Sequence, residues 1–137
     1  MKPDQRGDAF RVRDILRAAG SIRSYVHGMN RAQFNRDPKT QDAVIRKIEI
    51  LGEAAKNLSP AFREACPIDD WRKIAGMRDK LTHHYWKTDL DLVWEVAKKR
   101  VRHLAAALSR KKLSTNKTAR ELETEIAMIL AKRKTKP

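Results

Sequence analysis

The chain has 137 residues, a length typical of a single domain, of which 41% are hydrophobic and 35% charged, with a formal net charge of +14. Only five Gly and five Pro interrupt it, which argues against a turn-rich β fold and for long helices or strands. A single cysteine excludes an internal disulfide, and the sequence has neither a signal peptide nor a run of membrane-spanning length, so we expect a soluble, cytoplasmic protein with no membrane partner.

The periodicity along the chain is helical, and no convincing strand pattern occurs. We expect a first helix from about Asp8 to Val26, ended by Gly28, and a second from about Thr40 to Leu58, opened by Asp37-Pro38. Each has one apolar face. The predicted core residues of these two helices are Ile15, Leu16, Ala19, Ile22, Val26, Val44, Ile48, Leu51, Ala55 and Leu58.

Three further helices follow. Ser59-Pro60 predicts an N-cap and a first helical position, and Pro67 ends that short helix at Cys66. Asp69-Asp70 can cap the next helix, and Asp89 and Asp91 mark the start of the last of the three. The apolar stripe of that last helix comprises Val93, Val96, Ala97, Val101, Leu104 and Leu108. About five helices within residues 1–108 indicate an all-α antiparallel bundle with short loops.

Residues 109–137 differ in composition and form the second region of our predicted organisation. They begin with a polar, basic linker, followed by a capping box at Thr118–Glu121 and an amphipathic helix of about 14 residues that carries Leu122, Ile126, Ile129 and Leu130 on one face. So short a helix is marginal when isolated, so it should dock on the bundle, a second subunit or another protein, or else fray. We expect the basic tail from Lys132 to be disordered.

Charge favours a polyanionic partner. The surplus of Lys and Arg over Asp and Glu is +8 in residues 1–108 and +6 in residues 109–137. A surplus in both regions favours phosphate contacts and counterion release, although a generic basic surface would look the same in sequence.

The segment Arg78–Tyr85 carries the strongest chemical pattern, R-x4-H-x-Y. Arginine can hold a phosphate with a planar fork of donors, and histidine can move protons near neutral pH. On an ideal helix Arg78 and Tyr85 lie within about 20° of each other, whereas His83 points about 140° away from Arg78. Either the helix ends or distorts near Thr82–His84, or Arg78 and His83 act across an interface with a second copy.

Simpler interpretations exist for most of these residues. A bare Arg–His pair in a basic helical protein is usually a pair of surface residues. His83-His84 lacks carboxylate or cysteine neighbours at metal-binding spacing, so we expect no metal site and no cofactor. Cys66 fits a small buried apolar residue better than a nucleophile.

Over residues 10–108 the chain resembles the HepT branch of the HEPN ribonuclease toxins. The resemblance rests on ordered segments rather than on the motif alone. These segments are Tyr25–Gly28, Phe34-x-x-Asp37, Ala43–Ala55, Trp71–Asp79, His83–Tyr85 and Asp89–Trp94.

The resemblance implies a dimeric helical-bundle toxin of a type VII toxin–antitoxin system, which cuts RNA without a metal. It implies Arg78 and His83 as catalytic residues and Asp79 in a supporting role. It also implies a partner, a small nucleotidyltransferase antitoxin of the MntA type that attaches AMP to Tyr85, in a possible higher hetero-oligomer. Near the motif, Lys80 and Lys87 would hold the RNA backbone.

Two other functions fit the same residues. A non-catalytic module that binds nucleic acid or a nucleotidyltransferase would bind RNA with a steep salt dependence and not cleave it. A nucleotide-binding subunit that completes a nucleotidyltransferase would use Arg78 to grip a nucleotide phosphate. Calorimetry with ATP would separate this last function from the others.

Overall fold

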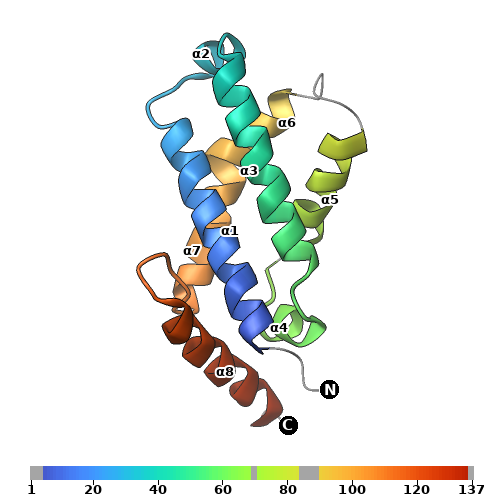
Figure 1. Cartoon of the computed structure of the whole chain (residues 1–137), viewed down its shortest axis with the longest axis vertical. Helices are drawn as coiled ribbons and strands as arrows, with labels where there is room; N and C mark the ends of the chain where they lie inside the picture. Colours follow the sequence, from blue (N-terminus) through green and yellow to red (C-terminus); the bar gives the residue numbers. More distant parts are fainter. Residues whose placement is uncertain (1–4, 69–70, 84–89, 136–137) are drawn as a thin grey trace.

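The computed structural model describes residues 5–68, 71–83 and 90–135, all of which lie in helices or the loops between them (Figure 1). The helices are α1 (Gln5–Tyr25), α2 (Arg31–Asn35), α3 (Pro38–Lys56), α4 (Pro60–Ala65), α5 (Trp71–His83), α6 (Leu90–Glu95), a π-helical turn η1 (Val96–Arg100), α7 (Val101–Arg110) and α8 (Ala119–Thr135). The all-α, HEPN-like bundle expected from the sequence is confirmed. No helix in the described residues is long and apolar enough to cross a membrane.

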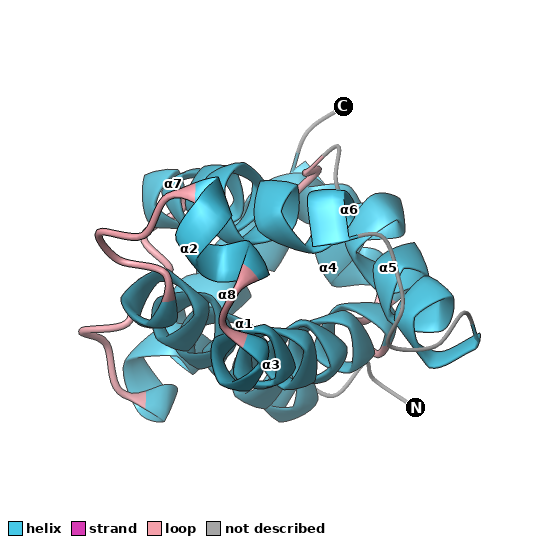
Figure 2. Ribbon diagram, turned by 90° about the horizontal axis from the view of Figure 1, so that it is seen from above, coloured by secondary structure: helices cyan, strands magenta, loops and turns pink. Residues whose placement is uncertain are grey.

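Four long segments run alternately up and down: α1, α3, α5 and the continuous unit α6–η1–α7 (Figures 1 and 2). Helix α3 lies between α1 and α5 and contacts both, and α1 also contacts α7. Every core residue predicted for α1, α3 and the α6–α7 unit is buried, with at most 4% of its surface exposed. Apolar burial of this kind supplies most of the stability of such a bundle, because a buried Leu or Ile contributes about 1.5–3 kcal/mol.

Local capping signals set the helix boundaries. The Asp37 carboxylate accepts a hydrogen bond from the Thr40 backbone N–H at 3.0 Å, and the hydrogen bonds from Thr40 lower the pKa of Asp37. Helix α3 therefore begins at Pro38, two residues earlier than predicted, with proline in the first turn. The Ser59 hydroxyl caps α4 as predicted and is itself held by buried Asp8 of α1, whose Oδ2 lies 2.6 Å from Ser59 Oγ. The predicted cap at Asp69-Asp70 and the predicted start at Asp89 lie outside the described residues.

Two features of the bundle were not predicted. Helix α2 is a single short turn with a capping box between Asn30 and Gln33, and it is joined to α6 by an ion pair between Arg31 and Asp91. The π turn η1 lies in the middle of what reads as one α-helix. Successive four-residue steps from Val93 to Ala97 to Val101 drift by about 80° around an ideal α-helix, and a wider π turn absorbs such a drift while keeping these residues on the core side.

The C-terminal helix docks on the bundle, one of the alternatives open from the sequence. It contacts α1 and α4, with Leu122 and Ile126 fully buried and Leu130 7% exposed (Figure 1). Its predicted capping box forms, since Thr118 and Glu121 exchange backbone-to-side-chain hydrogen bonds of 3.0 and 3.2 Å. Helix α8 continues as far as Thr135, and the expected disorder of the basic tail stays a prediction.

The segment between α7 and α8 is more ordered than a polar linker. Lys112 has a positive φ of 64°, and the next residue, Leu113, donates its backbone N–H to the Leu108 carbonyl at 2.9 Å. This arrangement is a Schellman motif, which ends α7 and turns the Leu113 side chain into the core. Leu113 is fully buried.

Candidate active site

Arg78 lies on α5 where that helix packs closely against Gly52 of α3. The closeness depends on Gly52 of α3, because a Cβ atom added there would lie 2.7 Å from the Cβ of Arg78 and 3.1 Å from the Ile74 carbonyl oxygen. Contacts below 3.0 Å are not tolerated, so the two backbones can approach only if position 52 has no side chain. Gly52 thereby fixes the height and distance at which α5 presents Arg78.

The guanidinium of Arg78 is held at one edge and open at the other. Its Nε donates to Glu53 Oε2 at 2.9 Å, and its Nη1 lies 3.8 Å from Asp79 Oδ1. Asn57, one turn further along α3, donates its side-chain amide to Glu53 Oε1 at 3.2 Å. The side chain of Arg78 is 32% exposed, so the terminal nitrogens remain within reach of an anion. Asn57, Glu53 and Arg78 form a chain of polar contacts that orients the arginine.

A shallow groove of about 490 Å³ runs across α1, α3 and α5 at this point. Its charged lining residues are Arg11, Arg46 and Arg78, with Asp14, Glu49 and Glu53. Three cations and three carboxylates balance, so these lining side chains carry no net formal charge. Arg78 is the lining residue that α5 contributes.

The other predicted site residues are described only in part. Asp79 and Lys80 are exposed on α5. Helix α5 ends at His83, whose side chain lies outside the described residues, as do Tyr85 and Lys87. Because the backbone is helical from Arg78 to His83, their Cα atoms are separated by about 140° around the helix axis. The local distortion that could bring both residues to one side of α5 is therefore absent before His83.

Sequence reasoning missed Gly52, Glu53 and Asn57 as site residues. A lone glycine inside a strongly helical pattern is a signal of close packing, and Gly52 could have been found in this way. Glu53 and Asn57 gave no such signal, since they read as ordinary members of the solvent face of their helix.

The described residues hold no group of three His, Cys, Asp or Glu side chains arranged to bind a metal ion. The Cys66 side chain is buried, and the Trp71 indole N–H donates to the Cys66 backbone carbonyl at 3.0 Å. Burial raises the pKa of this thiol, with a smaller opposing effect from Lys111. A buried thiol with a raised pKa acts as a small apolar core residue rather than as a nucleophile, as the sequence indicated.

Comparison with known proteins identifies the family. The family described as "Ribonuclease HepT-like" matches residues 15–110, which include α3, α5 and Arg78. The chain belongs to the HepT-like ribonuclease family. It is 40% identical over 87 residues to a protein of Thermococcus cleftensis named "Probable ribonuclease HepT", covering 64% of this chain and 79% of that protein.

Two more relatives of the HepT-like family carry names of the same kind. A candidate RNase of Methanocaldococcus jannaschii is 40% identical over 83 residues, covering 61% of this chain and 69% of its own length. A candidate RNase of Caldanaerobacter subterraneus is 39% identical over 90 residues, covering 66% and 80%. No solved structure matches the chain. Helix α8 lies beyond the part of the chain that the HepT-like family covers.

We expect Glu53→Ala to lower the maximal cleavage rate of RNA about tenfold, because loss of the 2.9 Å contact removes what holds the Arg78 guanidinium in one orientation. Glu53→Gln, which keeps an acceptor for Arg78 Nε, should recover most of the rate. The free energy of unfolding should change by less than about 1 kcal/mol, since exposed ion pairs contribute little.

The matched control is Glu49→Ala, which removes the same charge from the same groove. Glu49 forms its ion pair with Arg46 rather than with Arg78. Steady-state kinetics with a fluorescent RNA would separate the maximal rate from the Michaelis constant. Equal rates for Glu53→Ala and Glu49→Ala would show that Glu53 does not position the arginine.

Proposed function

We propose that the chain is the toxin of a type VII toxin–antitoxin system, a metal-independent endoribonuclease neutralised by a nucleotidyltransferase. The observation that carries this proposal is membership of the HepT-like ribonuclease family over residues 15–110, a span that contains the whole R-x4-H-x-Y motif. The half-open guanidinium of Arg78 supports it, because a phosphate can reach the terminal nitrogens that Glu53 leaves unused.

In the proposed reaction the 2′-hydroxyl of the RNA attacks the adjacent phosphorus. The O2′–P bond forms, the P–O5′ bond breaks, and the products are a 2′,3′-cyclic phosphate and a 5′-hydroxyl. Arg78 stabilises the charge that grows on the non-bridging oxygens. His83 orients the 2′-hydroxyl, takes its proton or delivers a proton to O5′. Asp79 supports Arg78 from the exposed side, and Lys80 and Lys87 hold the strand.

The helical backbone between Arg78 and His83 favours a site shared by two copies. Residues 140° apart on one helix cannot converge on one phosphate. Across a two-fold axis, the arginine of one copy can face the histidine of the other. A homodimer, and a larger assembly with the antitoxin, are therefore part of the proposal.

The direct experiment is cleavage of a defined RNA by the purified chain in excess chelator, with the 2′,3′-cyclic phosphate identified by mass spectrometry. Undiminished cleavage by both Arg78→Ala and His83→Ala would remove this mechanism. Loss of cleavage only upon chelation would remove its metal independence.

Regulation gives a separate prediction. After co-expression with a nucleotidyltransferase of the MntA type, intact-mass and peptide mass spectrometry should find AMP attached to Tyr85, and the modified protein should not cleave RNA. The added phosphate is a bulky anion beside the position of the substrate phosphate, so it blocks the site by size and by charge repulsion. Tyr85→Phe should remain active and escape modification. AMP found only at other residues would contradict the assignment.

A further inference from the structure

A groove of about 530 Å³ lies between the C-terminal end of α1 and the η1–α7 segment. Arg23 and His27 line it from the α1 side, and Lys98 and Arg102 line it from the other. Small residues, Gly20 and Ala97, lie between the two pairs. None of the described residues that line this groove is an Asp or Glu. We refer to it as the cationic groove.

Most of the positive charge in the cationic groove is uncompensated. Arg23 and Arg102 are exposed, and neither pairs with a carboxylate in the described part of the chain. Lys98 donates to the Val26 carbonyl at 3.0 Å and stands 5.0 Å from the centre of the Trp94 ring. The C-terminal dipole of a helix is equivalent to about half a negative charge, so α1 accounts for Lys98 but not for both arginines as well.

Three features of the backbone place the residues that line the cationic groove: the end of α1, the π turn η1 and Gly20. Arg23 lies in the last turn of α1 and His27 in the turn that follows it, whereas Lys98 and Arg102 are four residues apart along η1 and α7, so the second wall presents two neighbouring side chains. Lys98 belongs to the π turn, a feature that occurs often at functional sites. The glycine between the walls leaves open space, since a Cβ added at Gly20 would meet no atom within 4 Å.

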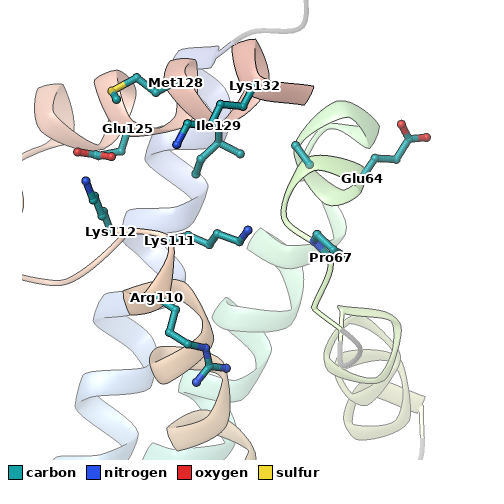
Figure 3. Close-up of a pocket in the computed structure, with 10 residues that line it drawn as sticks. Glu64, Pro67, Arg110, Lys111, Lys112, Glu125, Met128, Ile129 and Lys132 are labelled. Carbon is teal, nitrogen blue, oxygen red and sulfur yellow. The ribbon is translucent and has the colours of Figure 1, made fainter. Parts of the chain in front are cut away.

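Two other grooves on the molecule differ in charge. The groove beside Arg78 contains three carboxylates. The groove of about 500 Å³ between α4, the end of α7 and α8 is lined by four cations, Arg110, Lys111, Lys112 and Lys132, but also by the carboxylates Glu64 and Glu125 (Figure 3). Of these three grooves, the cationic groove is the one with no carboxylate among its described lining residues.

We propose that the cationic groove binds backbone phosphates of the RNA strand, away from the site of cleavage. Arginine forks bind phosphate oxygens in pairs, and exposed cations without an aromatic or large apolar anchor suit a polyanion better than a protein partner. That the polyanion is RNA rests on the proposed function. Figure 2 shows α7 and α5 on opposite sides of the bundle, so a strand that occupies the groove and the Arg78 region must wrap around the protein or reach a second copy.

The test compares the double variant Arg23→Gln/Arg102→Gln with the control Arg17→Gln/Arg36→Gln. Both remove two charges from exposed arginines whose side chains make no hydrogen bond or ion pair in the described part of the chain, and the control pair lies outside the cationic groove. The probe is a 2′-O-methyl oligouridine of about 30 nucleotides, which has phosphates but no attacking hydroxyl, titrated at several salt concentrations. Single-stranded DNA of equal length and inorganic phosphate are the other arms.

We expect the groove variant to bind the oligouridine about tenfold more weakly and its salt slope to fall by about 1.4, the value for two lost single-strand phosphate contacts. The control should bind within about twofold of the unmodified chain. DNA should show the same loss, because the groove recognises phosphate rather than sugar. Thermal melting of both variants would establish that they are folded.

Equal losses in the two variants, or no loss in either, would overturn the proposal. So would a groove variant that loses binding of inorganic phosphate but keeps that of the oligouridine, because the groove would then serve a small anion. If the unmodified chain binds RNA and never cleaves it, the proposed nuclease function fails while the comparison of variants still decides the role of the groove. If it cleaves RNA and both variants bind equally well, the proposal for the groove alone fails.

Discussion

Arg78→Ala is expected to lower the single-turnover rate of RNA cleavage by about 10²–10³, with chelator present throughout. Removal of one preorganised donor from a developing oxyanion has an effect of this size, because the donor acts more strongly on the transition state than on the substrate. Arg78→Lys should recover only part of the rate, since an ammonium keeps the charge but loses the planar fork and the Nε that Glu53 holds. Rapid-quench assays with a short fluorescent RNA would provide these rates.

Arg46→Ala is the matched control for this experiment. Arg46 lines the same groove and carries the same charge, but its side chain is more exposed and its ion pair is with Glu49 at 3.5 Å. Its removal should leave the cleavage rate within about twofold, as expected of an exposed side chain. If Arg46→Ala and Arg78→Ala lowered the cleavage rate by similar factors, Arg78 would act only through its positive charge and not through a specific contact with the phosphate.

Gly52→Val should destabilise the protein by about 3 kcal/mol and reduce cleavage with it. Its Cβ would meet the Arg78 Cβ at 2.7 Å and the Ile74 carbonyl at 3.1 Å, and neither atom is at the free end of a flexible side chain. Overpacking of this kind costs about 1–3 kcal/mol or more, and the two methyl groups of valine add to the clash. Helix α5 must then move away from α3 and take Arg78 with it. Urea unfolding followed by circular dichroism would measure the loss.

The control is Gly76→Ala, a glycine on α5 itself whose added Cβ would meet nothing within 4 Å. That variant should gain about 0.5–1 kcal/mol, because alanine restricts the unfolded chain and favours the helix. If Gly52→Val were as stable as the unmodified chain, close packing at position 52 would not be what places α5.

The helices could be predicted from the sequence because their signals are local. Ser59-Pro60 and Asp37-Pro38 each combine a capping side chain with proline in the first turn, and both helices begin there. The spacing of Val44, Ile48 and Leu51 needs only the period of one helix to show which face is buried. The apolar face of α8 left open whether this helix docks on the bundle, on another chain or frays, and its contacts with α1 and α4 could not be predicted.

Features that depend on contacts between segments distant in the chain could not be predicted from the sequence. The Arg78–Glu53 ion pair joins two helices whose relative register no local pattern reveals. Leu113 looked like one apolar residue in a basic linker, and its burial depends on the positive φ of Lys112. The π turn η1 replaces an α-helical turn of ordinary composition, so nothing in the residues marked it.

For the candidate site, the sequence named Arg78, and the structure adds what holds it. The catalytic role of Arg78 stays a prediction that rests on the family resemblance and on the motif, as do the roles of the other named residues, Asp79, Lys80, His83, Tyr85 and Lys87. Variants at three positions test the described part of the site separately. The Arg78 variants remove or change the donor, the Glu53 variants change its orientation, and Gly52→Val changes the packing of α5 against α3.

The docking of α8 has a consequence for synthesis on the ribosome. The N-terminal part of α1 packs against a helix that is translated about a hundred residues later (Figure 1). Until residues 119–135 emerge, that end of α1 lacks one of its apolar neighbours, and contacts so distant in sequence form slowly. The nascent bundle is therefore incomplete during elongation, an interval in which a chaperone can engage it before it matures.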